Sequence, residues 1–178
     1  VSYLSLYAFS TENWSRPKSE VTFLMTLLDR YLKKELPTYQ KNGIAFRAIG
    51  DRKRLSEALQ ERIRFTEEAT ARHVGLTQVL AINYGAKDEI TRAAKKLVAE
   101  GETIDEYHIA HALDTADIPD VDMLIRTGGE KRLSNFLLWQ SAYAELFFTD
   151  TLWPDFDEIE FGSLIDMFSN RTRRFGGI

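Results

Sequence analysis

The fold is decided by one short stretch, Gln78-Val79-Leu80-Ala81-Ile82-Asn83-Tyr84, which is nearly continuous in apolar residues. A strand that is apolar on both faces is typical of a parallel sheet covered by helices. Gly75, before the stretch, is a candidate to cap the end of a helix, and Gly85, after it, opens the next helix. The stretch therefore predicts a buried strand in an α/β protein.

Strands and helices alternate on both sides of this stretch. Strands are predicted at residues 1–9, 44–49, 120–127 and 144–148, and helices at residues 17–42, 56–73, 88–100, 105–113 and 161–169. Such an alternation requires a mostly parallel central sheet flanked by helices. We expect a single domain over residues 1–178.

Composition excludes several classes of protein. Of the 178 residues, 44% are apolar and 28% charged, which is typical of a soluble globular domain and not of a disordered chain. The absence of cysteine excludes a disulfide scaffold, a thiolate zinc site and a cysteine nucleophile. The net charge of −4 argues against nucleic acid as a partner. With no apolar run near the ~20 residues of a membrane span and no signal peptide, we expect a cytoplasmic protein.

The first candidate site is the turn from Ser10 to Pro17, directly after the first strand. It gathers hydroxyl groups, a carboxylate, a carboxamide, an indole and a guanidinium, on Ser10, Thr11, Glu12, Asn13, Trp14, Ser15 and Arg16. Ligands bind at the carboxyl ends of strands in open parallel sheets, so this is a candidate site. The alternative is an ordinary turn that caps the following helix.

The second candidate site follows the strand at residues 120–127. Gly128 and Gly129 allow positive φ and could present N–H groups to an anion, while Arg126, Arg132 and Ser134 supply side-chain donors. Guanidinium groups suit phosphate oxygens, so the segment predicts a phosphate or diphosphate site. Two adjacent glycines alone would also fit a plain turn.

Glu145 is the one carboxylate in an otherwise apolar strand, Tyr143-Ala144-Glu145-Leu146-Phe147-Phe148. A buried carboxylate must be paired or bound to a metal. The two interpretations are an ion pair with Arg126 or Arg132, and a ligand for Mg²⁺, which prefers carboxylate and phosphate oxygens.

Together, four motifs resemble the cis-prenyltransferases, and within them the bacterial undecaprenyl diphosphate synthase type. They are Phe9–Pro17, Arg126–Gln140, Tyr143–Leu146 and Trp153–Phe156, and the resemblance extends from residue 3 to residue 177. It implies a Mg²⁺-dependent enzyme that condenses isopentenyl diphosphate with an allylic diphosphate, usually farnesyl diphosphate. The product would be a Z-polyprenyl diphosphate, undecaprenyl diphosphate in particular, the lipid carrier of bacterial cell-wall and peptidoglycan synthesis.

The resemblance also implies a role for each position. Arg126, Arg132, Leu133 and Ser134 would bind isopentenyl diphosphate, and Glu145 its Mg²⁺. Ser10, Thr11, Glu12, Trp14 and Arg16 would contact substrate around the catalytic Asn13. A carboxamide is a very poor base, so we expect Asn13 to position substrate by hydrogen bonding, with a phosphate oxygen or water taking the proton.

The implied fold has an apolar tunnel between sheet and helices, assembled as a homodimer. Ala8, Leu24, Met25 and Leu28 would line the tunnel, although the three helical positions also fit an ordinary core. Arg174 and Gly176, in the basic C-terminal tail, would reach the partner's active site; the alternative is a frayed terminus.

One part of the family pattern is missing. The segment that binds the allylic diphosphate and supplies an Asp for Mg²⁺ would precede Val1, so the chain as given should be inactive alone. The competing hypothesis is a non-catalytic subunit of the same fold that binds a partner. Against it, Asn13, Arg126 and Glu145 are present, and such a subunit does not need them.

Overall fold

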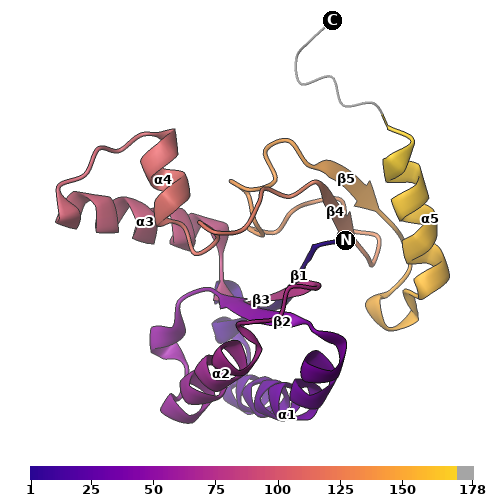
Figure 1. Ribbon diagram of the computed structural model, residues 1–178, viewed down its shortest axis with the longest axis horizontal. Coiled ribbons are helices and arrows are strands. Elements are labelled where there is room, and N and C mark those ends of the chain that lie inside the picture. Colours follow the sequence, from indigo (N-terminus) through magenta and orange to yellow (C-terminus); the bar gives the residue numbers. More distant parts are fainter. Residues whose placement is uncertain (172–178) are drawn as a thin grey trace, which may run out of the picture. The chain divides into compact units, whose positions relative to one another are not determined.

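The computed structural model describes residues 1–171, which form two compact units, Val1–Ile118 and Pro119–Ile178, the latter described as far as residue 171. The strands of the first unit are β1 (Tyr3–Ser10), β2 (Ala45–Ile49) and β3 (Thr77–Tyr84), and its helices are α1 (Lys18–Asn42), α2 (Glu57–Thr70), α3 (Ala86–Glu100) and α4 (Glu106–Ala112) (Figure 1). The second unit contains β4 (Met123–Arg126), β5 (Glu145–Phe148) and α5 (Glu158–Ser169). None of the helices in this described part is long and apolar enough to cross a lipid bilayer.

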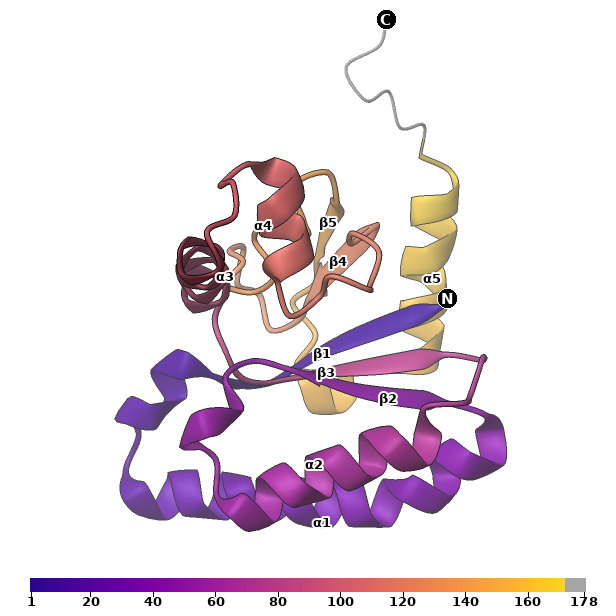
Figure 2. The ribbon, with the colours of Figure 1, turned by 60° about the vertical axis from the view of Figure 1, so that its left-hand side comes forward.

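The sheet of the first unit has the order β1-β3-β2, and both pairings are parallel. Leu80 of β3 aligns with Leu6 of β1 and Ala48 of β2, and this row faces the core formed with α1 and α2. Figure 2 shows these two helices together on one side of the sheet. Residues 78–84 are all buried, as the predicted central strand requires.

The free edge of β2 is closed by side chains. Three alternate N–H groups donate to side-chain oxygens: Phe46 to Thr70 Oγ1 at 3.0 Å, Ala48 to Glu67 Oε1 at 2.9 Å, and Gly50 to Asp114 Oδ2 at 2.9 Å. An exposed edge would otherwise invite another strand to pair. These contacts end the sheet at β2.

In the second unit, β4 and β5 pair in parallel as a separate two-stranded sheet, with Met123 opposite Glu145 and Arg126 opposite Phe148. The α/β class with parallel sheets and flanking helices is confirmed. The prediction of a strand over all of residues 120–127 is wrong in its bounds. The strand is shorter, and with one neighbouring strand only Leu124 in it is buried.

Helix boundaries follow local capping. Gly43, in the left-handed region at φ 63°, ends α1, and the helix therefore stops at the predicted residue 42. α5 begins three residues earlier than predicted because the Asp157 side chain accepts the Glu160 N–H at 2.8 Å. α2 ends at Thr70, and not at residue 73.

Candidate functional site

The turn after β1 is a short 3₁₀ helix, Thr11–Ser15, closed by Asn13. The backbone N–H of Ser10 donates to Asn13 Oδ1 at 2.8 Å, and Ser15 Oγ donates to the Glu12 carbonyl at 2.8 Å. Thr11 donates to the Glu12 carboxylate at 3.0 Å. Because its carbonyl oxygen is already engaged, Asn13 offers its amide N–H groups as donors.

Trp14 is fixed by contacts from the ends of all three strands in this unit. Its indole Nε1–H donates to Asn83 Oδ1 at 2.7 Å, and Phe9 meets its ring edge-on, with the centroids 5.1 Å apart. The guanidinium of Arg54 lies 4.2 Å from the ring centroid, in a cation–π arrangement. Sequence reasoning missed Asn83 and Arg54, since each is separated from Trp14 by many residues and joins it only through the sheet.

Arg16 and Tyr7 complete this end of the sheet. Arg16 is paired with Glu20 one helical turn away, at 2.7 Å, and both side chains are nearly half exposed. Burial, reinforced by the charge of Glu12, raises the pKa of the Tyr7 hydroxyl to about 12. It therefore stays protonated at neutral pH and donates to the Tyr84 carbonyl at 3.0 Å.

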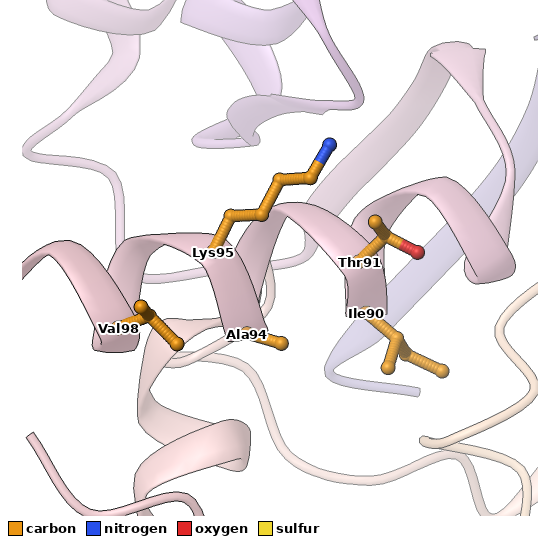
Figure 3. Close-up of a pocket in the computed structure, with 5 residues that line it drawn as sticks. All are labelled: Ile90, Thr91, Ala94, Lys95 and Val98. Atoms are coloured by element: carbon orange, nitrogen blue, oxygen red, sulfur yellow. The ribbon is translucent and has the colours of Figure 1, made fainter.

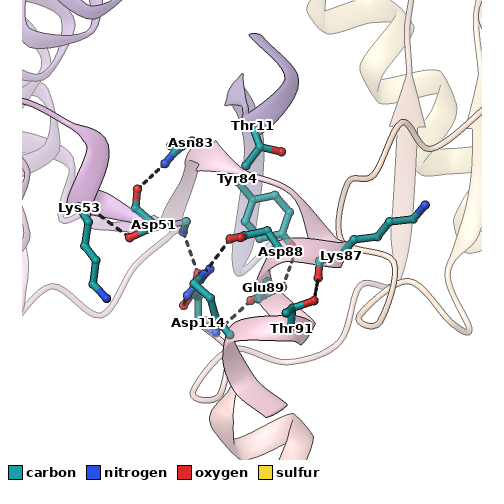
Figure 4. A network of polar contacts seen from close by, with 12 residues as sticks. Thr11, Asp51, Lys53, Asn83, Tyr84, Lys87, Asp88, Glu89, Thr91 and Asp114 are labelled. Atoms are coloured by element: carbon teal, nitrogen blue, oxygen red, sulfur yellow. Dashed lines mark hydrogen bonds and ion pairs between the residues drawn. The ribbon is translucent and has the colours of Figure 1, made fainter. Parts of the chain in front are cut away.

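A buried polar network lies next to this turn (Figure 4). Tyr84 donates to Glu89 Oε2 at 2.6 Å, and Glu89 Oε1 accepts the Asp114 N–H at 3.0 Å. Arg92 donates two hydrogen bonds to the Asp114 carboxylate, of 2.9 and 2.7 Å. Burial opposes ionisation of Asp114, but Arg92 and the N–H of Gly50 outweigh it and hold the pKa of that carboxyl below its usual value.

In the second unit, Arg126 organises the segment after β4. Its Nη1 donates to Ser134 Oγ at 2.6 Å and to the Arg132 carbonyl. Among the described residues Arg126 has no carboxylate partner within ion-pair distance, whereas Arg132 is paired with Glu130. Leu133 is half-buried between them. The structure thus brings the Arg126 side chain to Ser134 and to the backbone of Arg132, whereas the Arg132 side chain is paired with Glu130.

The two glycines behave differently from the prediction. Gly128 and Gly129 do adopt positive φ, of 83° and 76°. Their N–H groups, however, donate to the carbonyls of Thr151 at 2.8 Å and Thr149 at 2.9 Å. The expectation that both N–H groups face an anion is therefore wrong, because the backbone after β5 already uses them. Anion binding here must rely on side chains.

Glu145 is the first residue of β5, at the opposite end of the β4–β5 pair from Arg126. Along the strands, the Met123–Glu145 pair and the Arg126–Phe148 pair are three residue steps apart, roughly 10 Å at 3.3 Å per step. The carboxylate, 25% exposed, accepts a hydrogen bond from Arg171 Nη1 at 2.8 Å. The expected ion pair with Arg126 or Arg132 is wrong, because Arg171, which follows α5, takes that place.

The sequence of the chain matches a known protein family. A family model described as "Putative undecaprenyl diphosphate synthase" matches residues 1–176. The chain belongs to the undecaprenyl diphosphate synthase family. An isoprenyl transferase of Wolinella succinogenes is 59% identical over 178 residues, which cover all of this chain and 78% of the relative.

Two crystal structures resemble this member of the undecaprenyl diphosphate synthase family. A "probable undecaprenyl diphosphate synthase" from Campylobacter jejuni has a TM-score of 0.92 and 48% identity, covering 99% of this chain and 84% of that one. Lavandulyl diphosphate synthase from Lavandula x intermedia, in complex with dimethylallyl diphosphate, has a TM-score of 0.90 and 39% identity, with coverages of 99% and 79%. The resemblance to the cis-prenyltransferases is confirmed.

The residues predicted to line a tunnel occupy different environments in this synthase-family chain. Leu28 belongs to the core between sheet and helices, and Met25 packs against that core. Leu24 is half-buried one turn earlier. Ala8 is exposed at an irregularity of β1, where the register moves from Tyr7 to Phe9. Of the tail residues predicted to bind substrate, Arg174 and Gly176 lie outside the described residues.

Two surface hollows lie in the first unit. The one in Figure 3, of about 420 Å³, runs along one face of α3 and is lined by Ile90, Thr91, Ala94, Lys95 and Val98. The other, of about 630 Å³, follows the β2 edge beside Glu67 and Asp114. No residue predicted for substrate binding lines either hollow. Within residues 1–171, no group of three or more His, Cys, Asp or Glu side chains is placed to hold a metal ion.

Proposed function

We propose that this cis-prenyltransferase condenses isopentenyl diphosphate with an allylic diphosphate, farnesyl diphosphate in the first instance, and makes a long Z-polyprenyl diphosphate such as undecaprenyl diphosphate. The observation that carries the proposal is the guanidinium of Arg126, held against Ser134 with no carboxylate partner among the described residues. Such a group suits a diphosphate. The complex of the lavender relative with dimethylallyl diphosphate supports an allylic diphosphate as the second substrate.

Arg126 and Ser134 would hold the isopentenyl diphosphate. One nitrogen of Arg126 is used by Ser134 and the Arg132 carbonyl, which fixes the plane of the guanidinium and leaves its other N–H groups for phosphate oxygens. Arg132 would turn from Glu130 to the same ligand, since exposed ion pairs are weak, on the order of 1 kcal/mol or less. Leu133 would contact the substrate between them.

The transfer step joins C4 of isopentenyl diphosphate to C1 of the allylic substrate. The π electrons of the isopentenyl double bond form the new bond, the C1–O bond breaks with its electron pair leaving on diphosphate, and C2 of the isopentenyl unit loses a proton. Asn13 would orient the substrates with its amide N–H groups, since its carbonyl oxygen accepts the Ser10 N–H. The released diphosphate or a water would take the proton, because a carboxamide is too weak a base.

Ser10, Thr11, Glu12, Trp14 and Arg16 would contact substrate around Asn13. Arg16 would exchange its exposed partner Glu20 for a phosphate. Trp14 would present an immobile aromatic wall, because three contacts fix its ring. Developing positive charge on an allylic carbon is stabilised by such a wall.

Mg²⁺ is the cofactor we propose, with Glu145 as its protein ligand. Mg²⁺ typically uses one or two carboxylates and completes its shell with phosphate oxygens and water, so a single partly exposed carboxylate fits a site that substrate completes. Arg171 would have to leave Glu145 first. When bound, the ion supplies neutralisation of the charge on a diphosphate.

The remaining assignments concern the product and the assembly. Ala8 on β1 and Leu24, Met25 and Leu28 on α1 would line the path of the growing chain. Arg174 and Gly176 would complete the site of a homodimer partner. A segment before Val1 that binds the allylic diphosphate stays a prediction.

The test supplies the full-length protein with labelled isopentenyl diphosphate and farnesyl diphosphate, with Mg²⁺ or with excess EDTA. We expect label in long polyprenyl products only when Mg²⁺ is present. Arg126→Ala should raise the apparent KM for isopentenyl diphosphate about 10- to 100-fold, the equivalent of ~1.5–3 kcal/mol for a charge-assisted hydrogen bond. Arg64→Ala, at an exposed arginine of α2 paired with Glu61 and Glu68, should leave KM unchanged.

Other results would redirect the assignment. Absence of polyprenyl product under all conditions would overturn the proposal and favour a non-catalytic subunit, whereas turnover in EDTA would remove only the metal role. Glu145→Gln should weaken Mg²⁺-dependent substrate binding with the fold intact. A lowered melting temperature with normal kinetics would instead make Glu145 a structural partner of Arg171.

A further inference from the structure

We infer that Asn83 is a positioning residue of the Ser10–Ser15 turn, which holds Trp14, and through it Asn13, in the geometry that prenyl transfer needs. The inference rests on the role proposed above for that turn. Asn83 lies at the carboxyl end of β3, is 4% exposed, and accepts the Trp14 indole N–H at 2.7 Å. It belongs to neither of the two turns that the sequence singles out.

The Asn83 side chain ties together the ends of all three strands. Its Nδ2 donates to the Asp51 carbonyl at 2.6 Å, directly after β2, while its Oδ1 accepts from Trp14, in the turn after β1. The Asn83 carbonyl in turn accepts the Asp51 N–H at 3.2 Å. Both ends of one amide are thus used between segments that no local sequence signal connects.

The backbone at this point is built for such a connection. Asn83 has φ 49°, in the left-handed region, where Asn is the most favoured residue after Gly. Gly50, at the end of β2, comes so close that a Cβ there would lie 2.1 Å from the Ile82 carbonyl oxygen and 3.0 Å from that of Asn83. The close approach of the strand ends at Asn83 therefore requires a less favourable backbone conformation. Such local strain is typical of functional sites.

The other contacts of Trp14 are non-directional, including the packing of its ring against the hydrophobic core between the sheet and the helices. Phe9 meets the ring edge-on and Arg54 stacks on its face, and both contacts tolerate sliding or rotation of the ring. Among the hydrogen bonds of the described residues, the Nε1–Oδ1 bond is the one that sets the direction of the indole N–H. The loss of this short, partly buried hydrogen bond should release the ring and loosen the neighbouring Asn13.

The decisive variant is Asn83→Gly, because glycine keeps the positive φ and removes only the amide. We expect the Trp14 indole N–H, assigned by Trp14→Phe in ¹H–¹⁵N spectra, to exchange with solvent at least tenfold faster. We expect kcat to fall tenfold or more, with little change in the KM for isopentenyl diphosphate. Asn83→Asp keeps the acceptor for Trp14 but sets a carboxylate oxygen against the Asp51 carbonyl, so it should restore part of the indole protection.

Two controls separate positioning from general destabilisation. Gln78→Ala removes another buried amide of β3, one that donates to the Tyr31 hydroxyl at 3.0 Å near the amino end of the strand. It should lower thermal stability and leave kcat and indole exchange unchanged. If Asn83 acts through Trp14, the double variant Asn83→Gly/Trp14→Phe should be no slower than Trp14→Phe alone.

The inference is overturned if Asn83→Gly leaves indole exchange unchanged, or if its kcat stays within twofold of the wild type. It is also overturned if the kcat of the double variant Asn83→Gly/Trp14→Phe falls by the product of the two single losses. Should the wild-type protein show no prenyl transfer, the proposed function fails. In that event the indole exchange of Asn83→Gly and Asn83→Asp alone decides whether Asn83 holds Trp14.

Discussion

Replacing Asp114 by Asn should destabilise the first unit in a way that depends on pH. Asp114 Oδ1 accepts from Arg92 Nη1 at 2.9 Å, and Oδ2 accepts from both Arg92 Nη2 at 2.7 Å and the Gly50 N–H at 2.9 Å. Either orientation of an asparagine amide would point its NH₂ group at one or two of these donors. The variant therefore loses at least one charge-assisted bond and acquires a repulsive contact.

The expected loss is about 2–3 kcal/mol. A hydrogen bond to a charged group contributes ~1.5–3 kcal/mol. Breaking a fully buried ion pair costs about 3–5 kcal/mol, an upper limit here because Asp114 and Arg92 are 22% and 30% exposed. Asp117→Asn is the matched control: its carboxylate is 82% exposed and 4.0 Å from Arg47, so the change should stay within about 0.5 kcal/mol.

The pH dependence has a defined sign. Since the folded protein holds the pKa of Asp114 below its ordinary value, the ionised carboxylate stabilises the fold above the unfolded pKa of about 3.9. That contribution is lost as the pH falls through the lower, folded pKa. The difference between wild type and Asp114→Asn should thus be full at pH 7 and shrink below about pH 4.

The loss of stability can be measured at the Gly50 amide, which donates to Asp114, by hydrogen exchange in increasing urea at several pH values between 7 and 3. At pH 7 the Gly50 amide should exchange faster in Asp114→Asn than in the wild type. The difference in exchange rate between the two proteins should become smaller as the pH falls. Equal exchange in Asp114→Asn and Asp117→Asn, or a gap that is independent of pH, would refute the reasoning.

Four further variants test the sheet and the product path. Thr70→Val should cost about 1–3 kcal/mol by urea denaturation, because Thr70 is fully buried and its hydroxyl caps an N–H of the β2 edge; an unchanged midpoint would show that the N–H finds another acceptor. Gly50→Ala should lose more than about 3 kcal/mol or fail to fold, since its φ is 111° and the added Cβ would lie 2.1 Å from the Ile82 oxygen. Gly101→Ala, with φ 72° and open space around it, should cost only about 1 kcal/mol, and equal losses would contradict the steric argument. Leu24→Trp should shorten the polyprenyl product, as measured by chromatography, and an unchanged product distribution would place Leu24 in ordinary core.

Local patterns in the sequence determined the elements of this protein. The run at residues 78–84 predicts the buried strand β3, and the three-to-four spacing before Asn42-Gly43 predicts α1, because periodicity and capping act between near neighbours. The same reasoning grouped Arg126, Arg132 and Ser134, which share one segment. Motifs of this kind also carry the resemblance to the family.

Only the tertiary structure decided which distant residues meet. Asn83 contacts Trp14 and Asp51 because parallel strands bring their carboxyl ends to one edge, whatever their separation along the chain. Glu145 pairs with Arg171 and not with Arg126 or Arg132, which are closer to it in sequence. The strand register places Arg126 at the far end of the β4–β5 pair. Likewise, the carbonyls of a neighbouring segment occupy the N–H groups of Gly128 and Gly129. A hydrogen-bond partner is set by packing in three dimensions, and sequence spacing carries that information only within a turn of helix or a few residues of strand.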